Sequence, residues 1–314
     1  MNAILIVDKR ADHYAELIAS ALPEARLSVF SSPDDAGLEQ AAAVAPIWLA
    51  SASYAARVLA RSPATPAWLQ TTSAGVEPLF APGLPRPQRA SRAVGVFGQL
   101  MAEYVLTYLL AWRRHVFAWA QAQRQGVWEG PEPGSLQGLR IVIAGAGVIG
   151  QEVAGLLAPF GGSVRGVARQ ARPIAGFEQV YAQADLLEAA GWADVVVNVL
   201  PETPETRDIF DARFFAAMPA GGLFINAGRG TAVQDGDLVH ALESGHLGAA
   251  AIDVCRIEPL PDTHAFWRTP GLWLTGHSAA PTLPALLTPL FLENLQRWQR
   301  GEALRGELHF ERGY

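Results

Sequence analysis

Several residue types are scarce in this chain of 314 residues, and each shortage excludes a class of function. Cys255 is the single cysteine, so an internal disulfide and a cysteine-rich metal site are both excluded. Lys9 is the single lysine, which argues against Schiff-base chemistry and leaves no lysine-containing phosphate loop. No apolar run reaches the ~18 uncharged residues of a membrane span. We therefore expect a reduced globular protein of the cytoplasm.

Net charge and chain length further limit the possible partners and the number of domains. The formal net charge is -6, which argues against a nucleic-acid partner or an anionic membrane surface. The chain starts with a strand-like run, residues 3–7, without the basic region of a signal peptide. Half of the residues are hydrophobic, which is enough for two cores, and the length favours two domains.

Short apolar runs alternate with helix-like segments along both halves of the chain. This alternation is typical of parallel strands joined by crossover helices, and it predicts an α/β fold with two doubly wound parallel-sheet domains. We place one domain at residues 1–97 plus 285–314 and the other at 98–284. The strands are expected at 3–8, 26–30, 46–50 and 67–71, and then at 140–144, 163–168, 194–200, 222–226, 249–254 and 272–275.

One long helical stretch is expected from about Gly98 to Arg124, because it contains few helix breakers and many aromatic residues. A linker rich in glycine and proline follows at residues 126–138, and a final helix is expected over about 283–300. The long aromatic helix suggests that the protein is a homodimer.

A glycine-rich turn joins the strand at 140–144 to the next helix-like run. The motif reads Gly145-Ala146-Gly147-Val148-Ile149-Gly150. Gly145 permits a tight turn, Gly147 lets the backbone approach a pyrophosphate, and Gly150 lets the helix pack on the strand. In this strand–turn–helix context we predict a dinucleotide site, with the pyrophosphate at the helix N-terminus. The alternative is a turn that serves packing alone.

The acidic residue that would bind the ribose 2′-hydroxyl is missing. Ala168 stands at its position, and Arg169 and Arg172 follow. Arginine binds a phosphate through a planar fork, whereas an acid would repel it. We therefore predict that NADP(H) is preferred and that NAD(H) remains possible. The alternative is that both arginines are solvated surface residues.

Three strand-like runs of the second half each lead into a segment with a chemically active side chain: Arg229, Glu258 and His277. Ligands of open α/β sheets bind beyond the carboxyl ends of the strands, so these groups are expected to converge there. Arginine suits a carboxylate, histidine is able to donate a proton, and a nearby glutamate favours the imidazolium. The combination fits the reduction of a 2-keto acid, although spacing alone leaves a structural role open for each residue.

These segments resemble the D-isomer-specific 2-hydroxyacid dehydrogenase family over essentially the whole chain, and most closely the bacterial glyoxylate/hydroxypyruvate reductase A type. The resemblance is carried by Gly145-Ala146-Gly147-Val148, by the segment from Leu200 to Thr206, by Glu258-Pro259-Leu260-Pro261, by His277 with Ala279-Ala280, and by the tail Arg312-Gly313-Tyr314.

The resemblance implies a Rossmann-type cofactor domain, a flavodoxin-like substrate domain and specific residue roles. It makes Arg229 the substrate-binding residue, Glu258 the partner of the histidine, and His277 the acid/base. It also implies cofactor contacts of Asp253, Pro201 and Thr206, the first near the nicotinamide carboxamide. A loop with Ala74 and Gly75 would bind the substrate carboxylate through its backbone N–H groups, facing Arg229 across an interdomain cleft. Trp48 is expected to wall the pocket or, alternatively, to pack in the core.

The function implied is NADPH-dependent reduction of glyoxylate or hydroxypyruvate. Two alternatives stay open: a dehydrogenase for another D-2-hydroxyacid, such as D-lactate, phosphoglycerate or a longer chain, and a non-catalytic dinucleotide-sensing regulator. The sequence departs from the family pattern at three positions: the family usually has a small non-glycine residue where Gly228 stands, a proline where Gly276 stands and an aromatic residue where Cys255 stands. The two glycines are expected to loosen the loops that hold Arg229 and His277.

Overall fold

The computed structural model describes residues 3–62 and 64–311 and divides into two compact units. Unit 1 combines Met1–Val96 with Thr282–Tyr314, and unit 2 is Phe97–Pro281. The chain thus passes between the units at 96–97 and 281–282, where the sequence pattern placed boundaries at 97–98 and 284–285. The tail at 312–314, which contributed to the family resemblance, lies outside the described residues.

Unit 1 contains a parallel sheet with the strand order β2-β1-β3-β4-β5. Each strand is a short, mostly buried apolar run, and the order reverses beside β1, which is typical of a doubly wound sheet. The strands are β1 (Ala3–Val7), β2 (Arg26–Phe30), β3 (Ile47–Ala50), β4 (Trp68–Thr71) and β5 (Arg89–Ser91).

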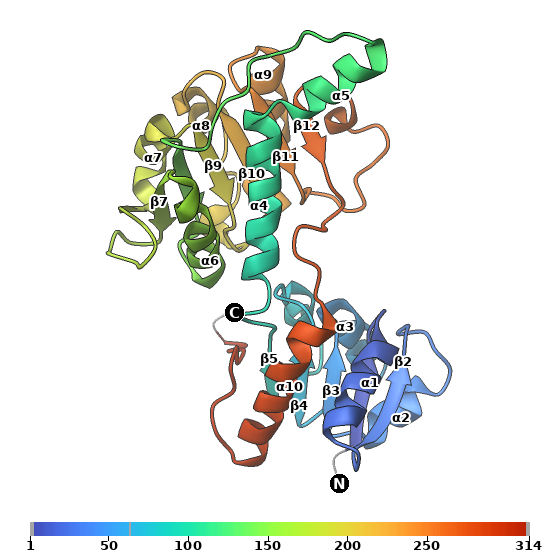
Figure 1. The fold of residues 1–314 in the computed structure, drawn as a ribbon. Coiled ribbons are helices and arrows are strands. Elements are labelled where there is room, and N and C mark those ends of the chain that lie inside the picture. Colours follow the sequence, from blue (N-terminus) through green and yellow to red (C-terminus); the bar gives the residue numbers. More distant parts are fainter. Residues whose placement is uncertain (1–2, 63, 312–314) are drawn as a thin grey trace. The chain divides into compact units, whose positions relative to one another are not determined.

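Helices cover both faces of this sheet (Figure 1). Successive strand residues point to opposite faces. Leu5 and Trp48 therefore pack with α2 and α3 in one apolar cluster, while Trp68 stacks on Phe291 of α10 at 5.3 Å between ring centroids. The helices of unit 1 are α1 (Ala11–Ala21), α2 (Leu38–Val44), α3 (Ala52–Arg61) and α10 (Pro284–Gln299).

Unit 2 contains a second parallel sheet, in the order β12-β11-β10-β9-β6-β7-β8. From β6, the strands β7 and β8 extend the sheet on one side, and β9 to β12 then extend it on the other side. The strand order therefore reverses between β6 and β9. The strands are β6 (Arg140–Ala144), β7 (Ser163–Ala168), β8 (Val180–Ala182), β9 (Val195–Asn198), β10 (Leu223–Asn226), β11 (Ala249–Ile252) and β12 (Leu272–Leu274).

Helices lie on both faces of this sheet (Figure 1). A separate apolar core fills the space between the sheet and the helices on each face. Apolar residues of α4 and α6 pack on one face, and those of α7, α8 and α9 pack on the other, where four phenylalanine rings meet. The helices are α4 (Gly98–Arg113), α5 (Val116–Gln125), α6 (Val148–Leu157), α7 (Leu186–Trp192), α8 (Ala212–Ala217) and α9 (Asp235–Glu243).

The expected single helix from Gly98 to Arg124 is wrong. The structure breaks it into α4 and α5 at Arg114 and His115, where His115 adopts a left-handed conformation with φ 53°. No residue between 99 and 125 is glycine or proline, so the sequence carries no local sign of the break.

The sheets contain two strands that the sequence pattern did not predict, β5 and β8. Both are three-residue edge strands, too short to show an alternating pattern. Among residues 3–62 and 64–311, no helix combines the length and the apolar character needed to cross a membrane.

Candidate active site

The candidate active-site residues of unit 2 all lie just beyond the carboxyl ends of the strands, along one edge of the sheet. Arg229 follows β10, Asp253 and Glu258 follow β11, and His277 follows β12, and these three strands are adjacent and parallel. Their carboxyl ends therefore share one edge, which is where ligands of open α/β sheets bind. The sequence pattern placed these residues at this edge.

His277 and Glu258 form a hydrogen-bonded pair. The Nδ1 atom of His277 lies 2.8 Å from Oε2 of Glu258, and the other carboxylate oxygen accepts a hydrogen bond from the backbone N–H of Cys255 at 2.9 Å. An ionised carboxylate only accepts hydrogen bonds, so Nδ1 carries the hydrogen. More than half of the His277 side chain is exposed, and its Nε2 atom is left to exchange a proton with a ligand.

Asp253 holds the loop that carries His277. Its buried carboxylate accepts hydrogen bonds from the Thr275 hydroxyl at 2.6 Å, the Ser278 N–H at 2.8 Å and the Ala279 N–H at 3.1 Å. Its carbonyl oxygen accepts from the His277 N–H at 2.8 Å. These bonds surround His277, which has a left-handed φ of 53°, an uncommon conformation for a residue with a side chain. Asp253 is thus part of the support of His277.

Tyr104 extends this support from the neighbouring helix α4. Its hydroxyl lies 3.0 Å from the Thr275 hydroxyl, which in turn donates to Asp253. Burial, opposed by the hydrogen bond to Thr275, raises the pKa of Tyr104 far above its ordinary value, so the hydroxyl keeps its proton. The network orients the loop without adding another ionised group.

A pair of buried asparagines supports the Arg229 loop. Asn198 and Asn226 are opposite each other at the ends of β9 and β10, and the Asn198 amide donates to the Asn226 side-chain oxygen at 2.9 Å. The Asn226 amide donates to the Arg229 carbonyl at 3.3 Å. The Arg229 guanidinium donates to the Gly228 carbonyl at 2.8 Å. The backbone at Arg229 is therefore anchored to two central strands.

The glycine-rich turn has the shape that a dinucleotide requires. Gly145 has φ 113°, and a Cβ on Gly150 would lie 2.1 Å from the Gly145 carbonyl oxygen, so the helix start lies directly on the turn. A Cβ on Gly147 would meet nothing within 4 Å, which leaves the outer side of the turn open. No side chain caps α6, so its first N–H groups remain able to bind a phosphate. These residues fit a pyrophosphate.

The other predicted cofactor residues lie at the same edge of unit 2 or shape it. Val148 is exposed, and Ile149 packs against the core formed with α4 and α6. Arg169 and Arg172 follow β7 and are exposed. Pro201 is exposed, whereas Thr206 is buried and donates its hydroxyl to the Pro201 carbonyl at 2.8 Å. Thr206 therefore shapes the 201–206 turn, and direct cofactor contacts of these residues stay predictions.

The predicted substrate loop belongs to unit 1. Ser73 is held through its carbonyl by the Thr71 hydroxyl at 2.8 Å and the Ala93 N–H at 3.1 Å. Within the described chain, no protein acceptor binds the backbone N–H of Ala74 or Gly75. Both N–H groups are thus available to an anion, and their binding of the substrate carboxylate, which the family resemblance implies, stays a prediction.

Trp48 is a core residue. Its side chain is fully buried in the cluster formed with α2 and α3, and its indole N–H donates to the Ala45 carbonyl at 3.0 Å. The expectation that it walls the pocket is wrong, because a fully buried ring offers no surface to a ligand; the alternative of core packing describes it.

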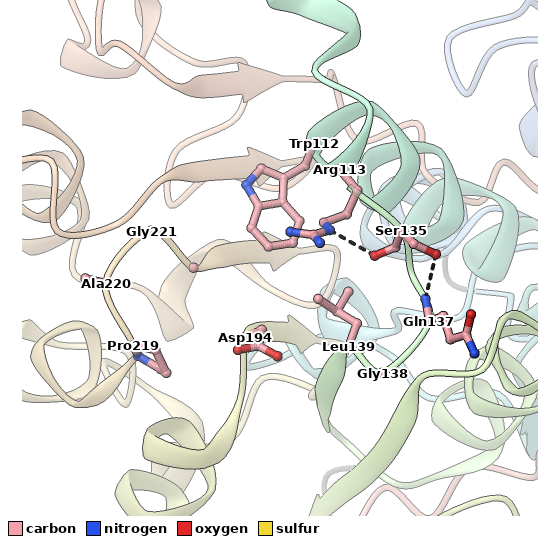
Figure 2. A pocket seen from close by; sticks show the side chains of 11 residues that line it. Trp112, Arg113, Ser135, Gln137, Gly138, Leu139, Asp194, Pro219, Ala220 and Gly221 are labelled. Atoms are coloured by element: carbon pink, nitrogen blue, oxygen red, sulfur yellow. Dashed lines mark hydrogen bonds between the residues drawn. The ribbon is translucent and has the colours of Figure 1, made fainter. Parts of the chain in front are cut away.

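A cavity of about 340 Å³ lies at the other edge of the unit 2 sheet (Figure 2). Its walls include Leu139, Asp194 and Gly222, the residues that immediately precede β6, β9 and β10. The amino ends of parallel strands face away from the carboxyl ends. Trp112 and Arg113 close the cavity from the end of α4. It is therefore separate from the candidate active site.

Five residues that support the site were not predicted from the sequence: Asn198, Asn226, Tyr104, Thr275 and Arg256, whose guanidinium donates to Asp208. The two asparagines gave a usable signal, since each is the polar end of an apolar strand. The partners of Tyr104 and Arg256 are 171 and 48 residues away, so no local pattern identifies them. Among the described residues, no three acidic, histidine or cysteine side chains group as metal ligands.

Comparison with known proteins shows similarity to one family. Residues 106–279 match the family model of the D-isomer specific 2-hydroxyacid dehydrogenase, NAD binding domain. A glyoxylate/hydroxypyruvate reductase A of Serratia proteamaculans is 35% identical over 216 residues, which are 69% of each chain.

Solved structures extend the similarity to nearly the full chain. A D-isomer specific 2-hydroxyacid dehydrogenase family protein of Aeromonas salmonicida has 36% identity, with a TM-score of 0.92 over 98% of this chain and 99% of its own. An NADPH-dependent glyoxylate/hydroxypyruvate reductase of Sinorhizobium meliloti, solved with NADP and sulfate, has 29% identity and a TM-score of 0.87 over 100% of both chains.

Proposed function

Because this chain belongs to the D-isomer specific 2-hydroxyacid dehydrogenase family, we propose that it reduces a small 2-keto acid, glyoxylate or hydroxypyruvate, to the 2-hydroxy acid with NADPH. The observation that carries the proposal is the hydrogen-bonded pair of His277 and Glu258 at the strand edge that also holds Arg229. A carbonyl reduction needs a proton donor and a carboxylate anchor, and these residues are of the right chemical types.

Unit 2 holds the dinucleotide. The turn Gly145–Gly150 and the uncapped start of α6 bind the pyrophosphate through backbone N–H groups. When bound, the reduced nicotinamide supplies the hydride that the carbonyl carbon accepts. The remaining tasks, which are to bind the keto acid, orient it and deliver a proton, belong to side chains and backbone of the protein.

Arg229 binds the substrate carboxylate. A guanidinium presents two parallel N–H donors to a carboxylate, and its loop is fixed by Asn226 and Gly228. We assign to Ala74 and Gly75 the role of backbone N–H donors to a carboxylate, since their N–H groups have no protein acceptor in the described chain.

His277 donates the proton. Glu258 accepts from Nδ1 and fixes the orientation of the ring, so Nε2 is the atom that delivers the proton to the substrate. As the carbonyl carbon gains the hydride, its oxygen gains the proton of His277, and the product is the neutral alcohol of the 2-hydroxy acid. In the reverse direction the neutral imidazole accepts the same proton.

The preference for NADP(H) rests on the residues after β7. Ala168 leaves no carboxylate to repel a 2′-phosphate, and Arg169 and Arg172 are exposed cations at the end of that strand. The pKa of Glu205, in the 201–206 turn, is lowered mainly by hydrogen bonds within the turn and also by the charge of Arg169. Replacing both arginines with glutamine should weaken NADPH binding at least tenfold and leave NADH binding unchanged.

We also propose that the protein is a homodimer. None of the residues of α5 is buried, although Phe117, Trp119 and the nearby Trp128 are large and apolar, with Trp128 93% exposed. An exposed apolar surface of this kind favours a protein partner. Light scattering of the purified protein tests this: a monomer at micromolar concentration would exclude it.

The experiment that tests the function is a panel of keto acids, glyoxylate, hydroxypyruvate, pyruvate and longer homologues, supplied with NADPH or NADH and followed by absorbance. We expect turnover of glyoxylate and hydroxypyruvate with NADPH. His277→Ala should lower kcat by about 10²–10⁴-fold while NADPH binding stays unchanged. His240→Ala, an exposed histidine of α9, is the matched control and should resemble the wild type. NADPH binding without turnover of any keto acid would refute the proposal.

A further inference from the structure

Three chain segments meet beside the Arg229 loop, and their backbones are bonded together. The Asp208 N–H donates to the Thr231 carbonyl at 2.9 Å, and the Phe210 N–H donates to the Ala232 carbonyl at 3.0 Å. The segment around Asp208 thus runs along the turn that Arg229 begins, Gly230–Ala232.

The third segment, which leads to Glu258, touches the same turn from the other side. A Cβ on Gly230 would lie 2.0 Å from the Cys255 carbonyl carbon and 2.4 Å from the Arg256 nitrogen. The two backbones are therefore in direct contact at Gly230. A shift of either loop has to move the other.

Arg256 fastens these segments with one side chain. Its Nη2 atom donates to the Asp208 carboxylate and to the Val233 carbonyl, and it lies 3.4 Å from the Thr231 carbonyl. The Arg256 side chain is only 30% exposed, and Asp208 adopts a left-handed φ of 57°, which aspartate tolerates better than most residues. We call Arg256, Asp208 and the Thr231 and Val233 carbonyls the arginine clamp.

The arginine clamp connects two residues of the candidate active site. Arg229 precedes Thr231 by two positions, and Glu258 follows Arg256 by two positions. Charge-assisted hydrogen bonds are stronger and more directional than neutral ones, so the clamp suits the task of fixing two loops. Neither Arg256 nor Asp208 is needed to hold the sheet, because the strands on both sides are paired independently.

We propose that Arg256 is a positioning residue that acts through Asp208 to keep the Arg229 loop in register with the Glu258 loop. The inference rests on the proposed function, because Arg229 is taken as the residue that binds the substrate carboxylate. The clamp acts on the guanidinium of Arg229 through its backbone, so its loss should weaken substrate binding more than the chemical step.

The test is steady-state kinetics of Arg256→Gln, Asp208→Asn and the double variant with glyoxylate and NADPH. We expect Arg256→Gln to raise KM for the keto acid about tenfold, which is the loss of one hydrogen bond to a charged group, while kcat changes less than about threefold. NADPH affinity should not change. The double variant should resemble Arg256→Gln, because both substitutions break the same bond.

Arg213→Gln is the matched control, since Arg213 pairs with Asp211 in the same unit but is 82% exposed. It should leave KM unchanged. Wild-type KM in Arg256→Gln, additive effects in the double variant, or an equal loss of NADPH affinity would each overturn the inference.

Hydrogen exchange separates this inference from the proposed function. Amide exchange of residues 229–234 should be faster in Arg256→Gln than in the wild type, whether or not the protein reduces a keto acid. Unchanged exchange in that segment would overturn the clamp, while an inactive wild type with faster exchange in the variant would overturn only the proposed function.

Discussion

Gly150 offers the sharpest test of the dinucleotide site. A methyl group at this position would lie 2.1 Å from the Gly145 carbonyl oxygen and 3.1 Å from the Gly145 carbonyl carbon. The oxygen is about 1 Å closer than an ordinary non-bonded contact, and it belongs to the backbone, so no side chain is able to yield. Gly150→Ala must therefore push α6 away from the turn that begins at Gly145.

The size of the effect follows from overpacking. Forcing a methyl group into a filled site costs about 1–3 kcal/mol. If the displaced start of α6 makes the free energy of NADPH binding less favourable by that amount, NADPH should bind about ten- to a hundredfold more weakly. The midpoint of thermal unfolding should also fall by about 2–4 °C for each kcal/mol lost in a unit of this size.

Gly155 provides the control within the same helix. A Cβ there would meet nothing within 4 Å, and the residue is exposed. Gly155→Ala should raise the free energy of unfolding by about 0.5–1 kcal/mol, because alanine loses less conformational entropy in a helix. Fluorescence titration with NADPH and thermal unfolding compare the two variants. If Gly150→Ala binds NADPH as tightly as Gly155→Ala, the turn does not depend on this close approach and the reasoning is wrong.

Two further expectations concern titrating groups. The Arg89 guanidinium donates to both carboxylate oxygens of Glu307 and holds the pKa of Glu307 below its ordinary value. The pair therefore stabilises the folded state above about pH 4.3, the ordinary pKa of glutamate. This stabilisation is lost as the pH falls through the lowered pKa of the folded state. Glu307→Gln should therefore lower the free energy of unfolding by about 1–3 kcal/mol at neutral pH, and a difference that persists unchanged in acid would contradict this. Burial, and then the charge of Glu258, raise the pKa of Cys255 to about 11. Because the thiolate is the reactive form, Cys255 should react with a disulfide reagent at pH 8 about a hundredfold more slowly than an exposed cysteine. Fast labelling of the folded protein would refute this.

The sequence predicted several strands well because short apolar stretches between helix-like segments leave a simple pattern. β2, β6 and β7 coincide with the expected ranges. β6 is a mostly buried apolar run, whereas β2 is an edge strand without a buried residue and β7 contains Arg165 and Gly166. The expected strands ending at Val254 and Thr275 are too long, because Asp253 and Thr275 leave the sheet to form the support of His277. Strand length was therefore misjudged at the functional edge.

The break between α4 and α5 was unpredictable for a different reason. The residues around His115 are all acceptable in a helix, and the left-handed turn there depends on contacts of the folded state. On one side of the break, Arg113 accepts a hydrogen bond through its carbonyl from Gly134, and on the other, Phe117 packs against Trp273 at 4.5 Å between ring centroids. Helix propensity depends on the local sequence and therefore does not reflect such tertiary contacts.

Gly228 and Gly276, the two glycines that depart from the family pattern, show that the effect of a loop glycine was not predictable from the sequence. Both were expected to loosen a catalytic loop, yet their surroundings differ. A Cβ on Gly228 would lie 2.8 Å from the Leu200 carbonyl oxygen and 2.9 Å from the Asn198 amide nitrogen, so this glycine permits a close contact that anchors the Arg229 loop. A Cβ on Gly276 would meet nothing within 4 Å, so no packing requires glycine there.

At Gly276 the restraint comes from neighbouring residues. The Thr275 hydroxyl and the backbone N–H groups of His277 and Ser278 all bond to Asp253, and they limit the loop on both sides of the glycine. A proline would restrict the backbone of one residue, whereas these hydrogen bonds restrict three. His277 therefore keeps its contact with Glu258 without the proline, and the effect of a loop glycine depends on tertiary partners that a motif does not contain.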